Sequence, residues 1–222
     1  MRAVIFDYGM VLCERDPDAY RRLLALTGVD RDTFERLYWS DRHQYDLGRI
    51  EATDWWANFA RDAGRSFTPA QVATLIECDV LLWTRLNVSM VAWAAALQAA
   101  GLRTAILSNM GPDLLRLMRR SPAFSWLSGF THLTWSCDLH IAKPDPAIYL
   151  HTCERLGVAP ADTLFLDDKP ENIAAAEALG IHGLLFTDVA QLRHDLTTRH
   201  LLQGYPLPGA PPEGAGPLTA SL

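Results

Sequence analysis

The spacing of hydrophobic and polar residues changes twice along the chain. A short apolar run at positions 3–6 is followed at once by Asp7, which is the pattern of a buried parallel strand. Between about Pro17 and Leu86 the apolar positions recur at helical spacing, and turn signals divide this stretch into several helices. From Ser89 onward, a helix, a glycine and a strand alternate repeatedly.

The alternating part of the chain predicts an α/β fold. We expect strands over 104–107, 132–135, 163–166 and 183–186, and helices over 89–100, 113–119, 146–156 and 173–179. Ser89 is the expected N-cap of the first of these helices. Strands and helices that alternate in this way form right-handed crossovers. The pattern therefore indicates a Rossmann-like parallel sheet with helices on both faces and a helical insert after the first strand.

Composition and charge exclude several classes of protein. The 222 residues, 49% hydrophobic and 21% charged, are typical of one globular domain or of one domain with an insertion. The formal charge of -6 argues against binding to nucleic acid or to an anionic membrane, since both need a basic surface. The four cysteines form no C-x-x-C pair, and the N-terminal apolar run is too short for a signal peptide. We expect a soluble cytoplasmic protein with reduced thiols.

Polar residues stand where the expected strands end, and parallel sheets bind their ligands at these positions. Asp7, the pair Ser108–Asn109 and the pair Asp167–Asp168 each follow an apolar run, and Lys143 precedes a helix. Carboxylates that share one crevice raise one another's pKa unless a cation lies between them. Oxygen ligands favour Mg²⁺, and Lys143 and Ser108 can hold an anion beside such a metal. The sequence therefore predicts a magnesium site that also binds an anion.

Four segments that contain these residues follow one another in a fixed order. They are VIFDYGMVL, TAILSNM, the lysine of IAKPDPAIY, and TLFLDDKPENIAAAEALG. Together they resemble the four motifs of the haloacid dehalogenase-like (HAD) hydrolase superfamily, over roughly residues 2–190. The resemblance is greatest to the phosphatase branch that includes the N-terminal domain of soluble epoxide hydrolase and sugar-phosphate phosphatases. It implies a phosphatase that depends on Mg²⁺.

The helical insert is similar to the small helical cap of that superfamily. The resemblance implies a catalytic core over 1–16 and 87–203 and a helical cap over 17–86. We expect the Pro- and Gly-rich tail, 204–222, to be disordered or loosely draped. A cap of this kind closes over the substrate and excludes bulk water.

The resemblance also implies a role for each motif residue. Asp7 is expected to be the nucleophile that forms an aspartyl-phosphate, which water then hydrolyses. Ser108 is expected to hold a phosphoryl oxygen with support from Asn109, and Lys143 to neutralise Asp7 and the transferring group. The expected metal ligands are Asp7, the backbone carbonyl of Gly9, Asp168 directly and Asp167 through a water, with Asn172 orienting the loop.

One position departs from the pattern of most phosphatases in this superfamily. They carry a second aspartate two residues after the nucleophile, as general acid and base, whereas this chain has Gly9. General acid-base help contributes a factor of about 10² to 10⁴ in rate. We therefore expect a leaving group that needs little protonation, such as an anomeric or acyl phosphate, or protonation by another residue. The candidates for that residue are Glu14, Asp16, Asp41, His43 and Asp46.

Aromatic and charged residues, including Trp39 and Arg49, cluster in the insert around the Gly48 turn, and such a loop could dip into the crevice. Arg42, Tyr45 and Asp46 are candidates for substrate specificity, with Arg42 contacting an anionic or hydroxylated end of the substrate. The alternative is that the aromatic residues fill the core of the insert while the charges face water.

We expect a phosphatase acting on a small phosphorylated metabolite, sugar phosphate-like in character. A 2-haloacid dehalogenase is the alternative enzyme, although its family lacks the paired acidic ligands that Asp167 and Asp168 provide. A receiver domain carries its acidic pair early in the chain, which does not match the order found here. A catalytically weak HAD-like binding protein is the third alternative, because Gly9 removes the expected acid. The sequence allows a monomer or a homodimer.

Overall fold

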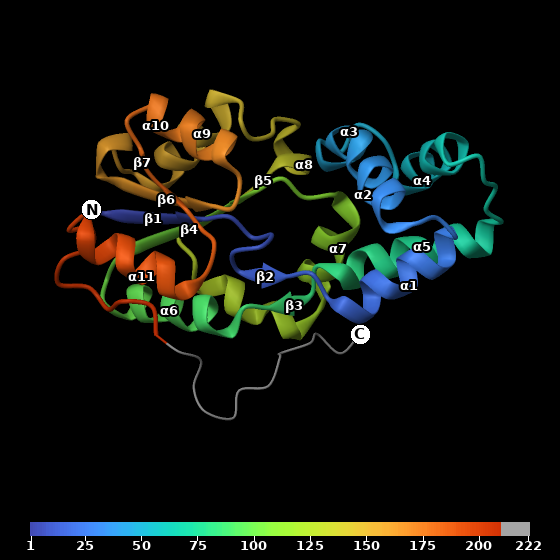
Figure 1. Ribbon diagram of the computed structural model, residues 1–222. Coiled ribbons are helices and arrows are strands. Elements are labelled where there is room, and N and C mark those ends of the chain that lie inside the picture. The colour runs from blue at the N-terminus through green and yellow to red at the C-terminus, as the bar shows by residue number, and fades with distance from the viewer. Residues whose placement is uncertain (210–222) are drawn as a thin grey trace.

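The molecule is built around a parallel β-sheet, which lies beside a separate group of helices (Figure 1). The computed structural model describes residues 1–209. The sheet has five strands in the order β5-β4-β1-β6-β7, and all neighbouring pairs are parallel. Its strands are β1 (Ala3–Phe6), β4 (Arg103–Ser108), β5 (His132–Trp135), β6 (Thr163–Asp167) and β7 (His182–Leu185). The predicted α/β class is confirmed.

Helices cover both faces of this sheet (Figure 1). The helices outside the insert are α6 (Val88–Ala99), α7 (Pro112–Arg120), α8 (Ser136–Leu139), α9 (Pro146–Leu156), α10 (Pro170–Ala178) and α11 (Val189–Thr198). Two 3-10 helices, η1 (Pro122–Gly129) and η2 (Pro160–Asp162), lie between them in sequence. α6 and α11 pack on one face of the sheet, and α9 and α10 pack on the other.

Strand β1 is buried on both faces of the sheet, which explains its continuous apolar sequence. Val4 and Phe6 belong to the hydrophobic cluster with α6 and α11, whereas Ala3 and Ile5 belong to the cluster with α9 and α10. All four side chains are fully buried. A strand covered on both faces has no solvent side, so no polar alternation is needed along it.

The chain between β1 and α6 forms the helical insert. Its helices are α1 (Pro17–Thr27), α2 (Arg31–Ser40), α3 (Arg42–Asp46), α4 (Ala52–Asp62) and α5 (Pro69–Leu82). Side chains that accept backbone N–H bonds begin three of these helices: Asp16 for α1, Asp30 for α2, and Thr68, in a capping box, for α5. Local sequence therefore defines these helix starts.

A short antiparallel ribbon connects the insert to the core. Strand β2 (Cys13–Glu14) pairs with β3 (Arg85–Leu86), where the chain leaves and re-enters the core. Close by, the Asn87 N–H donates to the Leu12 carbonyl at 2.9 Å. The sequence pattern did not predict this ribbon, because strands of two residues have no detectable period.

Aromatic side chains fill the interior of the insert. Phe34 stacks on Tyr38 with ring centroids 5.3 Å apart, and Tyr45 stacks on Trp55 at 5.2 Å. Trp56 packs against Trp55 and is fully buried. The insert therefore has a hydrophobic core of its own, dominated by rings that each bury a large apolar area.

Some element boundaries differ from those expected. Helix α6 begins at Val88, and the Asn87 side chain, rather than that of Ser89, caps it by accepting from the Met90 N–H. The expectation for Ser89 was wrong because Asn and Ser are almost equally good N-cap residues, so two caps were available within three positions. Helix α10 begins three residues earlier than predicted, at Pro170, a residue type favoured in the first helical turn.

The first part of the predicted tail packs against the core. The Pro206 carbonyl accepts from Trp93 Nε1 at 2.7 Å, and the Pro208 carbonyl accepts from the Arg193 guanidinium at 3.1 Å. Residues 204–209 thus lie along α6 and α11, as in the draped alternative and not the disordered one. Residues 210–222, the rest of that tail, lie outside the described residues.

Two predictions concern membranes and thiols. Over residues 1–209 the structure contains no helix with both the length and the apolar character needed to cross a membrane. The four cysteines are free and buried. The prediction of reduced, packed thiols is confirmed.

Candidate active site

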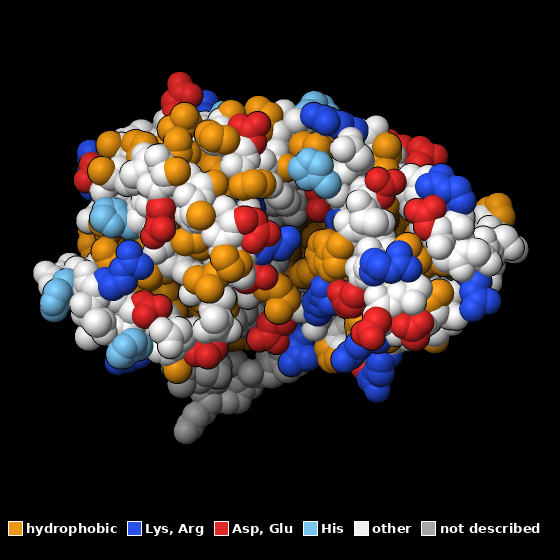
Figure 2. Space-filling view, turned by 45° about the horizontal axis from the view of Figure 1, so that its top comes forward, with side chains coloured by type: hydrophobic (Ala, Val, Ile, Leu, Met, Phe, Trp, Pro, Cys, Tyr) orange, Lys and Arg blue, Asp and Glu red, His pale blue; other side chains and the backbone are white. Residues whose placement is uncertain are grey.

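A cavity of about 580 Å³ opens where the carboxyl ends of β1, β4 and β6 face the insert. In the space-filling view, acidic, basic and apolar side chains gather at the hollow between the two parts of the molecule (Figure 2). The sequence-predicted residues that line the cavity are Asp7, Gly9, Arg42, His43, Asp46, Ser108, Asn109, Lys143, Asp168 and Asn172. Four separate motifs thus meet at one edge of the sheet.

Lys143 lies at the centre of the acidic group. Its Nζ is 2.9 Å from Asp7 Oδ1 and 2.6 Å from Asp167 Oδ2, and its side chain is almost completely buried. Burial by itself would lower the pKa of Lys143, but the Asp167 and Asp7 carboxylates outweigh it and hold that pKa above its usual value. The ammonium group therefore stays charged and links the ends of β1 and β6.

Asp167 is held by several hydrogen-bond donors. Besides Lys143, its carboxylate accepts from the Lys169 backbone N–H at 2.8 Å and from Asn172 Nδ2 at 2.9 and 3.0 Å. The residue is fully buried and does not line the cavity. A carboxylate satisfied in this way orients its neighbours, which suits the predicted water-mediated role better than direct ligation.

Asp7 and Asp168 are the two acidic side chains of this group that open into the cavity. Burial raises the pKa of Asp7 to about 7; Lys143 opposes the shift, and Asp167 and Asp168 add to it. Burial also raises the pKa of Asp168. One oxygen from each of Asp7, Asp167 and Asp168 lies within 4.8 Å of the others. Three carboxylates with one lysine leave an excess of negative charge that a divalent cation would balance.

Asn109 fixes the backbone of Lys143. Its Oδ1 accepts from the Lys143 N–H at 2.8 Å, and its Nδ2 donates to the Lys143 carbonyl at 2.9 Å. This reciprocal pair ties the end of β4 to the lysine loop. The buried Ser108 hydroxyl next to it makes only a long contact, 3.4 Å, with the Asn109 carbonyl. Ser108 therefore retains its capacity to bond a ligand in the cavity.

Gly9 lies on the cavity wall beside an indole ring. A Cβ atom built on Gly9 would be 3.6 Å from Cζ3 of Trp83, an ordinary van der Waals contact. Gly9 also forms an isolated bridge with Cys13, which fixes the turn after Asp7. The space around Gly9 has room for a Cβ atom, so the surroundings do not require a glycine at this position. The predicted role of its carbonyl in metal binding stays a prediction.

Arg42 is held inside the insert. Its Nε donates to Asp46 Oδ1 at 3.0 Å, and its Nη1 donates to Asp79 Oδ1 and to the Tyr38 hydroxyl at 2.7 Å each. The guanidinium also lies 4.7 Å from the Trp55 ring centroid. These contacts pair the charge of Arg42 within the protein. The alternative placed the aromatic residues in the core of the insert and the charges in water, but Arg42 and Asp46 are buried.

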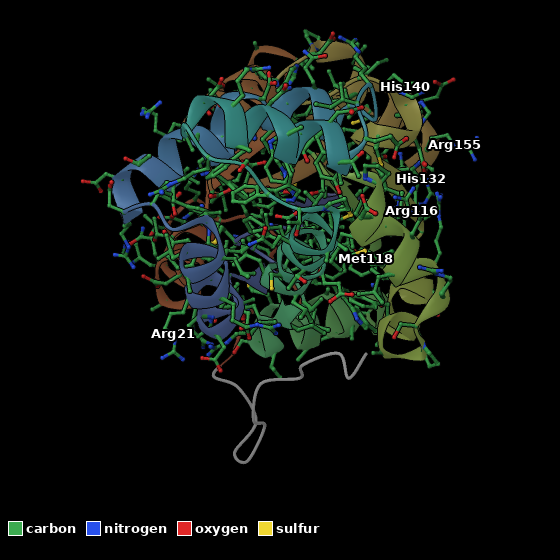
Figure 3. The ribbon with its side chains drawn as sticks, turned by 90° about the vertical axis from the view of Figure 1, so that its right-hand side faces the viewer. Arg21, Arg116, Met118, His132, His140 and Arg155 are labelled. Atoms are coloured by element: carbon green, nitrogen blue, oxygen red, sulfur yellow. The ribbon has the colours of Figure 1, made fainter. Side chains whose placement is uncertain are left out.

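Tyr45 joins the insert to the core and does not line the cavity. Its hydroxyl donates to Asp113 Oδ2 at 2.8 Å, and its ring fills the space in which a side chain at Gly111 would stand. Beside it, His140 Nδ1 lies 2.8 Å from the Leu47 carbonyl. Figure 3 labels His140 and Arg116, which follows Asp113 in α7; both belong to the core. The predicted specificity role of Tyr45 has no direct contact to support it.

Two of the five candidates for a replacement acid line the cavity, namely His43 and Asp46. Asp46 is paired with Arg42, and burial raises its pKa. The other three are engaged elsewhere: Glu14 with Arg85, Asp16 as the N-cap of α1, and Asp41 with Asn58.

Sequence reasoning missed the apolar and cationic residues of the cavity. They are Tyr8, Met10, Arg15, Trp83, Met110, Leu114 and Lys169, whereas Trp39, which also lines the cavity, belonged to the cluster expected to reach the crevice. Trp39 and Met10 are among the few large hydrophobic side chains that are exposed, at 38% and 41%. Their helical or loop positions carry no signal that separates a cavity wall from a core.

Comparisons with known proteins agree with the fold and with the motifs. A family model for hydrolases, described as haloacid dehalogenase-like hydrolase, matches residues 1–180. A sesquiterpene phosphatase of Aspergillus oryzae is 29% identical over 191 residues, which cover 84% of this chain and 90% of that protein.

Solved structures share the same architecture. A predicted HAD-like family hydrolase from Porphyromonas gingivalis superposes with a TM-score of 0.71 at 26% identity, covering 91% of this chain and 99% of that one. A HAD family enzyme from Bacteroides thetaiotaomicron, in complex with magnesium and inorganic phosphate, gives a TM-score of 0.67 at 18% identity and covers 84% and 94%. The sheet and the insert are thus common to these proteins.

Proposed function

The chain belongs to the haloacid dehalogenase-like hydrolases, and from this premise we propose that it is a Mg²⁺-dependent phosphatase of small phosphorylated metabolites. One observation carries the proposal. Asp7 and Asp168 open into the same cavity, beside the buried Lys143 that pairs with Asp7. A nucleophile, acidic ligands and a fixed positive charge at one point are the parts that phosphoryl transfer needs.

The donor set fits magnesium. The ligands are oxygen atoms, and the acidic group has more negative charge than Lys143 can balance. We assign direct contacts to Asp7, Asp168 and the Gly9 carbonyl, and a water-mediated contact to Asp167. The bound ion would neutralise charge on the phosphoryl oxygens.

Asp7 is oriented for nucleophilic attack by one of its oxygens. The Tyr8 N–H at 2.6 Å and Lys143 Nζ at 2.9 Å both contact Oδ1. Within residues 1–209, Oδ2 accepts no hydrogen bond. Oδ2 therefore forms the bond to phosphorus while the bond from phosphorus to the leaving oxygen breaks. Water then hydrolyses the aspartyl-phosphate and restores the carboxylate.

The neighbouring residues hold the transferring group. The Ser108 hydroxyl donates to a phosphoryl oxygen, and Lys143 lowers the negative charge shared by Asp7 and that group. Asn109 positions Lys143 through its two backbone hydrogen bonds, and Asn172 positions Asp167. These two side chains act through other residues and do not touch the phosphate.

The relatives support this assignment. One is a sesquiterpene phosphatase that matches most of the chain, and a protein of the same fold binds magnesium and inorganic phosphate. Neither relative defines the substrate of this chain, since specificity in a shared fold depends on the site. A sugar phosphate remains within the proposed substrate class.

The test is phosphate release from a panel of acyl, anomeric and alkyl phosphates, with Mg²⁺ or with EDTA. The wild-type protein should release phosphate only with the metal, and Asp7→Asn should release none. Chloride release from a 2-chloroacid that persists in EDTA would instead identify a dehalogenase. Magnesium binding without turnover of any substrate would indicate a binding protein.

A further inference from the structure

The wall of the cavity beside Asp7 consists of an indole ring. Trp83 lies next to Gly9, at the position where the family's general acid would begin, with 3.6 Å between its ring and an ideal Cβ. The Trp83 Nε1–H already donates to the Tyr38 hydroxyl at 3.0 Å. Trp83 therefore presents an apolar surface to the leaving group. It cannot serve as a general acid for that group.

A second indole extends this surface toward the cavity mouth. The ring centroid of Trp39 is 6.3 Å from that of Trp83, with the rings at 65°. Trp39 is 38% exposed, so packing inside the insert leaves much of it open. We call Trp39 and Trp83 the indole platform. Trp83 is 8% exposed, so Trp39 supplies most of the open ring surface. An exposed ring of this kind binds flat apolar groups through area burial and edge or face contacts.

A cationic side chain lies beside the platform. Lys169 Nζ is 5.1 Å from the Trp39 ring centroid, and Lys169 follows the acidic pair at the end of β6. Arg15 also approaches Trp39, at 5.4 Å, but its guanidinium is paired with both carboxylate oxygens of Glu35. Lys169 therefore places a positive charge near the cavity region in which the leaving group would carry its negative charge.

We propose that this site selects aryl phosphates, in which a flat aromatic ring carries the departing oxygen; the inference rests on the phosphatase function proposed above. The ring packs on the indole platform. Asp7 Oδ2 bonds to phosphorus, and the electron pair of the broken bond leaves on the phenolate oxygen. The phenolate is weakly basic, so it departs without a proton from the protein and later takes one from water. The absent acid at Gly9 and the indole platform thus favour one substrate class.

The proposal requires two features of the substrate, an aromatic ring and a weakly basic leaving group. Four phosphates test these two features separately. Phenyl phosphate has a ring and a weakly basic leaving group, benzyl phosphate has the ring alone, and acetyl phosphate has the leaving group alone. Ethyl phosphate has neither. The readout is kcat/KM for phosphate release in the presence of Mg²⁺, since this ratio covers the steps up to cleavage of the first bond. We expect phenyl phosphate to exceed benzyl phosphate by about a hundredfold, because no acid assists the benzyl alcohol.

Substitutions at Trp39 and Gly9 test each requirement separately. Trp39→Ala should lower kcat/KM for the two ring substrates by about tenfold more than for acetyl and ethyl phosphate, while Trp39→Phe should retain most of the preference. Gly9→Asp should raise the benzyl and ethyl values more than the phenyl value. Leu150→Ala, at an exposed α9 position away from the cavity, is the control and should behave as wild type.

The outcomes distinguish this inference from the proposed function. Equal losses for all four substrates in Trp39→Ala, or a benzyl value as high as the phenyl value, would overturn the aryl proposal while the phosphatase stands. No phosphate release from any of the four would overturn both. Circular dichroism of Trp39→Ala and Trp39→Phe shows whether a loss comes from unfolding.

Discussion

The molecule contains two buried cations that each lie between two aspartates. In the core, Lys143 joins Asp7 and Asp167; in the insert, Arg42 joins Asp46 and Asp79. The core group has a further carboxylate in the cavity, Asp168, and within residues 1–209 one oxygen of Asp7, Oδ2, accepts no hydrogen bond. In the insert group, the Tyr38 hydroxyl and aromatic rings pack around Arg42, although Arg42 and Asp46 also line the cavity.

The comparison shows that charge composition does not distinguish a reactive site from a structural one. What differs is the surroundings of each cation. In the insert, the Tyr38 hydroxyl and three aromatic rings pack around Arg42, and its ion pairs hold helices α2, α3 and α5 together. In the core, Asp168 and the Ser108 hydroxyl face the cavity beside the Lys143–Asp7 pair, so this group can bind a metal and a substrate.

Lys143→Met should have the largest effect, because it alters both chemistry and stability. Activity should fall by at least about 10² to 10³-fold, since the positive charge beside the nucleophile is lost. Two buried carboxylates also lose their partner, which should lower the free energy of unfolding by about 3 to 5 kcal/mol without metal. Phosphate release and urea unfolding measure the two effects. Added Mg²⁺ should recover part of the stability, and a variant that Mg²⁺ cannot stabilise would contradict this account of the core group.

Arg42→Met should destabilise the protein by a similar amount, about 3 to 5 kcal/mol, because Asp46 and Asp79 would be buried without their cation. Mg²⁺ should add no more stability to this variant than to wild type. Urea unfolding with and without the ion checks this, with the exposed Arg36→Met as control. If Arg42→Met kept its stability but lost substrate binding, Arg42 would be a specificity residue, as the sequence first suggested.

Magnesium should stabilise the wild-type fold by about 2.7 kcal/mol at a concentration of 100 times its dissociation constant. Asp168→Asn should remove most of this gain, because Asp168 is the acidic ligand with the most access to the cavity. Thermal unfolding measures the gain, and Asp54→Asn, at an exposed position of the insert, is the matched control. An unchanged response to Mg²⁺ in Asp168→Asn would place the ion elsewhere.

Asp46→Asn should give the smallest effect, because Arg42 keeps its pair with Asp79 and the new amide oxygen can accept from Arg42 Nε, and this effect should depend on pH. Burial raises the pKa of Asp46 in the folded state, so the folded protein holds a proton that the unfolded chain releases. This contribution to stability is present at acid pH and is lost as pH rises through the folded pKa. The stability of the variant relative to wild type should therefore increase from pH 4 upward. Urea unfolding at several pH values, with the exposed Glu77→Gln as control, checks the sign.

Much of the fold could be predicted because its signals are local. The apolar run of β1 ends at Asp7, and that of β6 ends in an acidic pair, so both position and chemistry are visible along the chain. Parallel strands then bring those ends to one edge. The two-residue strands β2 and β3 have no period, and their pairing became visible only in the folded protein.

The walls of the cavity could not be predicted in the same way. Trp39 was named in a cluster that could reach the crevice, but core packing was an equal alternative, because a ring at the cavity and a ring in the core have the same spacing. Trp83, which follows the end of α5, had no signal of its own. The pairing of Arg42 with Asp79 spans 37 positions between two helices of the insert. Such long-range pairing depends on how the helices pack, and sequence periodicity does not record it.

The most direct test of the account is to find the phosphoryl group on the enzyme. Wild-type protein turning over acetyl phosphate with Mg²⁺ would be quenched in acid, digested and analysed by mass spectrometry. The account predicts one phosphoryl group on the peptide that contains Asp7, absent in Asp7→Asn and lost when substrate is exhausted. Phosphate release that continues in Asp7→Asn, or a phosphoryl group on another residue, would contradict it.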